Sequence, residues 1–114
     1  LNTNLNLLEK HQGSLIASGK RVIEVELSAI RIGEFRLVTF PGELTVQLGL
    51  NFKKNSKSPN AFLSGYTNGY IYYAPTAAQL RNPGNAQEDC DSVLSPQWES
   101  IFEKKSIELL QRLN

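Results

Sequence analysis

The sequence breaks sharply at Pro41-Gly42-Glu43, directly after an apolar run that ends at Phe40. Proline fixes φ and lacks an amide donor, and glycine adopts backbone conformations that are closed to other residues. The chain must therefore turn here, which predicts that a strand ends at Phe40 and presents Glu43. Two interpretations of Glu43 stay open, because a glutamate after Pro-Gly is either a first-turn helix residue stabilised by the dipole or a ligand.

A second break follows the short apolar run Ala61-Phe62-Leu63, where the chain passes through Gly65 and Asn68-Gly69 before three tyrosines arrive at Tyr70, Tyr72 and Tyr73. In α/β proteins, ligands gather where strands stop and loops begin, so a glutamate and a tyrosine at two such breaks can converge on one ligand or ion. Packing is the alternative, since a tyrosine buries a large area while its hydroxyl finds a partner. Asn68-Gly69 also fits an ordinary hairpin turn.

Composition bounds the chain to one domain. It has 114 residues, of which 40% are hydrophobic and 20% are charged, as in ordinary globular proteins. The net charge of +1, with no basic run longer than a pair, gives no electrostatic footprint for nucleic acid. No apolar stretch approaches the roughly 20 residues that cross a bilayer, and the single cysteine, Cys90, excludes an intrachain disulfide.

The N-terminal half predicts a helix and then a hairpin. Leucines at helical spacing among polar residues indicate a helix over 1–18. From Arg21 the period changes to two, which predicts a half-exposed strand with Ile23, Val25, Leu27 and Ala29 on one face. Gly33-Glu34 then predicts the turn of a β-hairpin leading into Phe35–Phe40.

The C-terminal half predicts one strand and two helices. Residues 60–66 have the pattern of a buried strand, Thr76 can cap a short helix that ends at Arg81, and 82–85 form a loop. Ser95-Pro96 is typical of a helix start, with the serine hydroxyl as the cap and proline in the first turn. Together these elements predict an α/β layered unit: a mixed β-sheet of about three or four strands with flanking helices, belonging to a larger catalytic domain.

At its two breaks the sequence resembles the neutral/alkaline (non-lysosomal) ceramidase family of zinc-dependent amide hydrolases, in the later part of the catalytic domain. In that family a Pro-Gly-Glu follows a strand, and further on comes a segment of the form Asn-x-Tyr-x-x-Tyr-x-x-Thr. Here these motifs are Pro41-Gly42-Glu43 and Asn68 to Thr76. The resemblance covers about Val22 to Leu113, and it departs from the family at 77–87, where a tyrosine- and glutamate-containing segment is missing.

The resemblance implies that Glu43 and Tyr73 are metal ligands in a zinc site, with Asn68 and Tyr70 binding substrate or shaping the loop. A carboxylate oxygen is an ordinary zinc ligand, whereas a phenol needs the cation to lower its pKa. The family's other two ligands are histidines from earlier in the domain, and this chain has only His11, far from either motif. The resemblance therefore implies that residues 1–114 are a single domain or a fragment, the C-terminal portion of a ceramidase-like catalytic domain.

The resemblance further implies a parent hydrolase of sphingolipid metabolism that acts on N-acyl sphingoid lipids and is exported or periplasmic. Its partner would be the remainder of the catalytic domain, and the fragment alone would be inactive, with no tightly bound zinc. The resemblance also favours a helix that starts at Pro41-Gly42-Glu43, although the strict alternation of apolar residues over 44–52 is typical of a strand. The alternative function is a freestanding tyrosine-rich binding or assembly module without catalysis.

Overall fold

The computed structural model describes residues 22–114. The helix predicted over 1–18, with His11 in it, lies outside the described residues. Within them a three-stranded sheet has the order β1-β2-β4, in which β1 (Ala29–Ile32) pairs antiparallel with β2 (Phe35–Thr39) and β2 pairs parallel with β4 (Ala61–Ser64). A small second sheet joins β3 (Glu43–Leu44) and β5 (Tyr73–Ala74) in parallel. The predicted α/β unit with a mixed sheet is confirmed.

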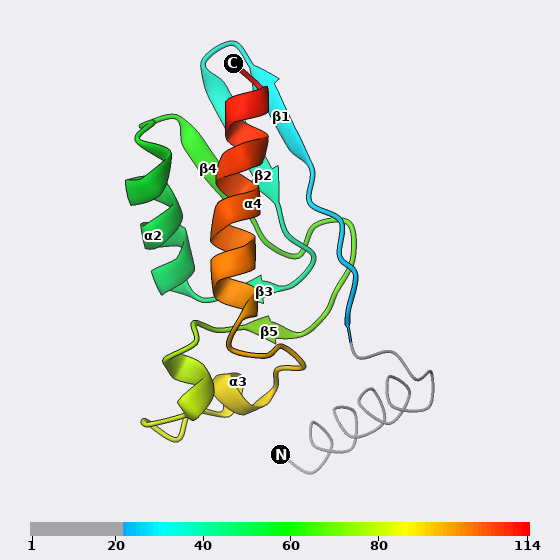
Figure 1. Cartoon of the computed structure of the whole chain (residues 1–114), viewed down its shortest axis with the longest axis vertical. Coiled ribbons are helices and arrows are strands. Elements are labelled where there is room, and N and C mark those ends of the chain that lie inside the picture. The colour runs from blue at the N-terminus through cyan, green and yellow to red at the C-terminus, as the bar shows by residue number, and fades with distance from the viewer. Residues whose placement is uncertain (1–21) are drawn as a thin grey trace.

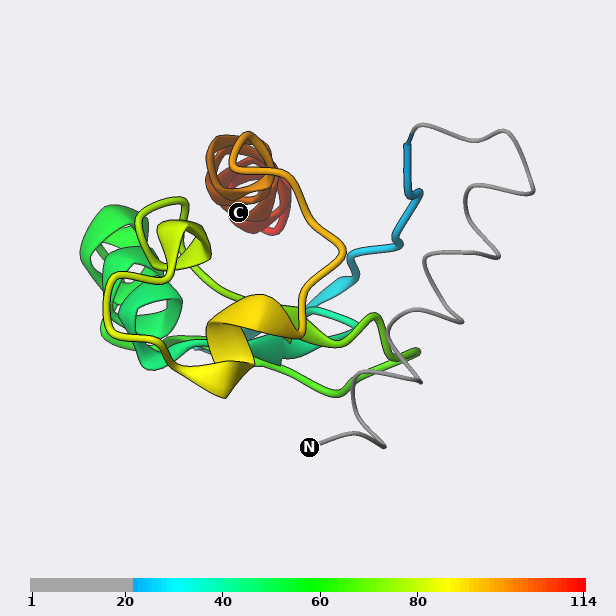
Figure 2. The same ribbon diagram turned by 90° about the horizontal axis from the view of Figure 1, so that it is seen from below.

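Two long helices pack together against the sheet. Helix α4 (Trp98–Arg112) crosses in front of β2, and α2 (Val46–Ser56) lies beside it, in contact with both α4 and β4 (Figure 1). The 3-10 helix η1 (Gln79–Arg81) and the short α3 (Gln87–Cys90) lie next to each other near β5, at the end of the molecule that carries the small sheet. Figure 2, a view from below, shows that α4 lies on one side of the sheet.

An aromatic cluster fixes the point at which β2 ends. The side chain of Phe40 is 2% exposed, and its ring lies 5.5 Å from that of Trp98 and 5.2 Å from that of Phe102, centroid to centroid. Trp98 also donates its indole N–H to the carbonyl of Pro75, at 2.8 Å, so its one polar group is satisfied in the core. Because Phe40 precedes Pro41 directly, this packing anchors the first sequence break to α4.

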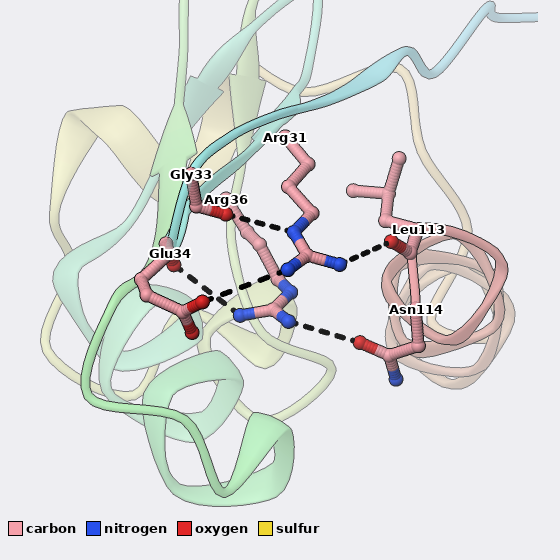
Figure 3. Close-up of polar contacts among 6 residues, drawn as sticks. All are labelled: Arg31, Gly33, Glu34, Arg36, Leu113 and Asn114. Atoms are coloured by element: carbon pink, nitrogen blue, oxygen red, sulfur yellow. Dashed lines mark hydrogen bonds and ion pairs between the residues drawn. The ribbon is translucent and has the colours of Figure 1, made fainter.

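The far end of α4 is held by two arginines of the hairpin (Figure 3). Arg31 and Arg36 are opposite each other in the β1–β2 register, a pairing of like charges that is unfavourable by itself. Arg31 donates to the carbonyl of Leu113 at 3.3 Å and Arg36 to the side-chain oxygen of Asn114 at 3.0 Å, and Arg31 also pairs with Glu34 at 3.6 Å. Positive charge at a helix C-terminus is favourable, so both guanidinium groups have compensating partners.

The predicted strand from Arg21 is wrong over most of its length. Residues 23–28 form no strand, and regular pairing begins only at Ala29. Strand β2 ends at Thr39, which still binds Ser28 through its backbone N–H at 2.8 Å, and beyond it Pro41 leads the chain away. No partner strand is thus left for 23–27, and Ile23, Val25 and Leu27 instead line an apolar groove of about 430 Å³ against α4.

Two other boundaries differ from the sequence predictions. The helix expected from Pro41-Gly42-Glu43 begins only at Val46, because Glu43 and Leu44 pair with β5. Helix α4 begins at Trp98, and the hydroxyl of Ser95 does not cap it. The cap at Thr76 is confirmed: its hydroxyl accepts the N–H of Gln79 at 3.1 Å, and the Gln79 side chain accepts the N–H of Thr76 at 2.8 Å, the reciprocal pattern of a capping box.

Candidate functional site

The pairing of β3 with β5 brings the two predicted ligands side by side. Glu43 and Tyr73 are direct partners in the parallel register. The backbone N–H of Glu43 donates to the carbonyl of Tyr72 at 3.0 Å, one of the hydrogen bonds that join the two parallel strands. Side chains of paired residues in neighbouring strands project from the same face of a sheet. The carboxylate of Glu43 and the phenol of Tyr73 therefore leave the backbone on the same side.

The loop between β4 and β5 wraps around the Pro-Gly-Glu turn. Tyr66 donates its backbone N–H to the carbonyl of Gly42 at 3.0 Å, and Ile71 donates to that of Pro41 at 2.8 Å. Thr67 donates in the same way to Phe40, at 3.2 Å. The backbone carbonyls of residues 40–42 thus all accept hydrogen bonds from the loop between β4 and β5. The Pro-Gly-Glu turn and this loop therefore form one structural unit.

This unit requires glycine at position 42. A Cβ atom there would lie 2.9 Å from the carbonyl oxygen of Tyr72 and 2.9 Å from the ring of Phe40. The first neighbour is backbone and the second is a buried ring of the core, so neither moves aside easily. Gly42 therefore sets how closely the Glu43 strand approaches the tyrosine loop.

The loop carries its tyrosines on an unusual backbone. Tyr66, Asn68 and Tyr72 have φ values of 52°, 63° and 68°, in the left-handed region. Asparagine tolerates this conformation, whereas for tyrosine it costs on the order of 1–3 kcal/mol unless the surroundings hold it in place. Asn68, predicted to bind substrate or shape the loop, thus occupies one of the left-handed turns that direct the neighbouring tyrosines.

Three phenols surround the Glu43 carboxylate. Tyr70 donates its hydroxyl hydrogen to Oε1 of Glu43, and the hydroxyls of Tyr66 and Tyr73 lie close enough to this carboxylate to lower its pKa. The rings of Tyr66 and Tyr70 stack with centroids 6.1 Å apart and planes at 11°, and Tyr70 in turn contacts Tyr72 at 5.4 Å. Of the predicted site residues, the structure brings Glu43, Tyr70 and Tyr73 together and adds Tyr66 to them.

These hydrogen bonds shift the pKa values of all four groups. Partial burial raises the pKa of Glu43, but the hydrogen bonds from Tyr66, Tyr70 and Tyr73 outweigh it and leave the pKa below its usual value. The hydrogen bond to Glu43, with smaller contributions from desolvation and from the negative charge, raises the pKa of Tyr66 to about 12. The same causes raise the pKa of Tyr70 and Tyr73. In this structure the cluster is one carboxylate held by neutral phenols.

The oxygen atoms of this cluster fit part of a metal site, not a whole one. Among residues 22–114, no group of three or more histidine, cysteine, aspartate or glutamate side chains is placed to hold a metal ion. Zinc in proteins takes three or four protein ligands, and carboxylate oxygen is one of its usual donors. Glu43 and Tyr73 could therefore supply two positions around one cation, with the remaining ligands coming from elsewhere.

Sequence reasoning did not single out Tyr66 from the other tyrosines. The signal was its position, since Tyr66 and Tyr70 flank Asn68-Gly69 and a tight turn brings such flanking residues to one side. In the structure the chain bends at Tyr66 and Asn68, and the Tyr66 and Tyr70 rings stack.

The fold is that of a ceramidase-like α/β unit. Among solved structures, the chain is similar to the neutral ceramidase of Pseudomonas aeruginosa, with a TM-score of 0.64 and 19% sequence identity over 73% of this chain and 14% of that one. It is also similar to a structure described as ceramidase complexed with C2, with a TM-score of 0.60 and 20% identity over 76% of this chain and 15% of that one. At such identities the likeness concerns the fold.

The chain thus spans about one seventh of the length of the ceramidases that it matches. No protein-family model matches the sequence, and no curated protein matches it either. The predicted resemblance to ceramidases is therefore supported at the level of three-dimensional structure.

Gly42→Ala tests the close approach of the two breaks. We expect it to lower the free energy of unfolding by about 1–3 kcal/mol, because the new methyl group overpacks against the Tyr72 carbonyl and the Phe40 ring. Gly49→Ala in α2 is the matched control: nothing lies within 4 Å of its added Cβ, and alanine favours a helix, so stability should rise by about 0.5–1 kcal/mol. Urea unfolding of both variants measures this, and equal effects would contradict the packing.

The raised pKa of Tyr66 has a consequence at high pH. Because the pKa is above that of an unfolded tyrosine, the contact stabilises the folded state fully below pH 10 and is lost as the pH rises toward about 12. An ultraviolet titration of phenolate should therefore show tyrosine ionising near pH 12, and Glu43→Gln should return this phase toward pH 10. A single transition near pH 10 in the unsubstituted protein would contradict the contact.

Proposed function

We propose that this chain is part of a zinc-dependent, ceramidase-like hydrolase that cleaves the amide bond of N-acyl sphingoid lipids, with Glu43 and Tyr73 as two of its zinc ligands. The observation that carries the proposal is the direct pairing of these two residues in the β3–β5 register, which directs both side chains to the same face of the small sheet. The likeness of the fold to neutral ceramidases supports it. The sphingolipid substrate follows from that likeness alone.

The roles of the side chains follow from their chemistry. Bound zinc acts as a Lewis acid and lowers the pKa of a water molecule, which supplies the nucleophile for amide hydrolysis. Glu43, an anion at neutral pH, gives the site its negative charge and one oxygen donor. Tyr73 would supply a second oxygen donor, as a phenolate whose pKa the nearby cation lowers. The two histidines of such a site would come from outside this chain, whose only histidine is His11.

The sheet offers the rest of such a domain a surface on which to pack. Ile32 and Phe35 are partners in the β1–β2 register, and their side chains are 66% and 41% exposed. Ile30, two residues before Ile32 and so on the same face, is 49% exposed. An exposed apolar patch of this kind marks an interaction surface. We assign it to the remainder of the catalytic domain, without which the fragment is inactive.

A freestanding binding module is the second candidate, and one observation favours it. Tyr66 and Tyr70 are 68% and 50% exposed while their rings stack, which presents a rigid aromatic surface to solvent. Rigid tyrosines of this kind form contact surfaces at low entropic cost. In this function Glu43 would only orient the rings, and no metal would be required.

Metal analysis of the complete gene product tests the two candidates against each other. The proposal predicts bound zinc and hydrolysis of N-acyl sphingosine. Glu43→Ala and Tyr73→Phe should each weaken zinc binding and activity by more than the 10–100-fold that typically follows loss of an outer-shell partner. Glu34→Ala is the matched control, since this carboxylate lies on the exposed hairpin turn and its loss should change neither. A metal-free protein whose activity survives Glu43→Ala would refute the proposal.

A further inference from the structure

We propose that Tyr66 and Tyr70 are positioning residues for Glu43: their hydroxyl groups hold its carboxylate in the orientation in which one Glu43 oxygen and the Tyr73 oxygen face the same cation. The inference rests on the proposed function for its purpose. The geometry behind the inference is independent of that function: it is the Tyr70 hydrogen bond to Glu43 and the stacking of Tyr66 on Tyr70.

The first step is the count of acceptor positions on the carboxylate. Its two oxygens offer about four lone-pair positions, of which the Tyr70 hydroxyl occupies one. With Tyr73 facing a cation, Tyr70 would still hold the carboxylate, and free positions would remain on it for the metal. Hydrogen bonds of this kind orient metal ligands and are part of how proteins tune a site.

The second step is that the positions of both hydroxyls are fixed by the backbone. Tyr66 is held at φ 52° by its N–H bond to the Gly42 carbonyl, one residue before Glu43 itself. Tyr70 stacks on the Tyr66 ring and is followed by Ile71, whose N–H binds Pro41. The loop that carries Tyr66 and Tyr70 is therefore hydrogen-bonded to the same Pro-Gly-Glu turn that carries the Glu43 carboxylate.

The third step is that packing alone gives little reason for this conformation. Tyr66 is 68% exposed, so its ring buries little apolar surface in return for a left-handed backbone. Strained residues persist when the surrounding structure holds them, and they cluster at functional sites. What this backbone secures is the position of the Tyr66 ring, which stacks on Tyr70, the donor to Glu43.

The test uses Tyr66→Phe, Tyr70→Phe and the double variant in the 114-residue chain, since phenylalanine keeps each ring and removes only the hydroxyl. Ser100→Ala, which removes one exposed hydroxyl from α4, is the matched control. Three-bond NMR couplings of the Glu43 side chain should indicate one rotamer in the unsubstituted protein and in Ser100→Ala. They should indicate averaging between rotamers in the double variant.

A zinc titration of the same proteins gives the second readout. In the unsubstituted chain, added Zn²⁺ should shift the Glu43 and Tyr73 resonances together, and the double variant should need about 10-fold more zinc or greater for the same shift. A purely structural role would lower the melting temperature and leave the Glu43 couplings unchanged, which would overturn the inference. Should the double variant not fold, Tyr70→Phe, at a side chain that is 50% exposed, decides by the same couplings.

The two readouts also separate this inference from the proposed function. If zinc shifts neither Glu43 nor Tyr73 in the unsubstituted chain or in the complete gene product, the metal site is refuted. The couplings then still show whether the two phenols position the carboxylate. Couplings that do not change in any tyrosine variant overturn the positioning role, whatever the zinc titration shows.

Discussion

The site depends on the close approach of Gly42 to the carbonyl of Tyr72, which leaves no room for a side chain at position 42. On one side of it, Phe40 is locked into the aromatic cluster with Trp98 and Phe102, and on the other side the tyrosine loop binds the carbonyls of 40–42. Since the core positions the turn and the turn positions the loop, the carboxylate of Glu43 and its phenol donors are placed by the hydrophobic packing of α4. A substitution in the core is thereby connected to the chemistry of the site.

The site was more predictable from the sequence than parts of the fold were. Pro41-Gly42 and Asn68-Gly69 constrain the backbone locally, so the end of the strand before Pro41 and the loop before Tyr73 followed from residue types. Glu43 itself begins a second strand, β3. That the two strands pair in parallel, with Glu43 opposite Tyr73, is a long-range property that no local pattern contains. The contribution of Tyr66 was missed for the same reason, since it depends on the left-handed backbone of a turn.

Alternation of apolar residues is typical of a strand over both 23–27 and 44–52, although the ceramidase resemblance favoured a helix over the second. Over 23–27 it has the period of a strand, yet a strand needs a hydrogen-bonding partner, and here the apolar side chains line a groove against α4 instead. Over 44–52 the same alternation belongs largely to a helix, because positions four apart also share a helix face. Leu48 and Phe52 are buried there at 1% and 3% exposure, while Val46 and Leu50 remain exposed on the other side of α2. Period alone did not separate the two structures.

The central physical claim is that Glu43 and the tyrosine loop act as one coupled unit, and a double-mutant cycle of Glu43→Gln and Tyr70→Phe tests it most directly. The free energies of unfolding of the unsubstituted chain, the two single variants and the double variant give the coupling between the carboxylate and the phenol. The account predicts a favourable coupling of about 0.5 kcal/mol or more, as for residues in one hydrogen-bond network. Effects that add to within about 0.3 kcal/mol would contradict it, because two independent side chains behave in that way.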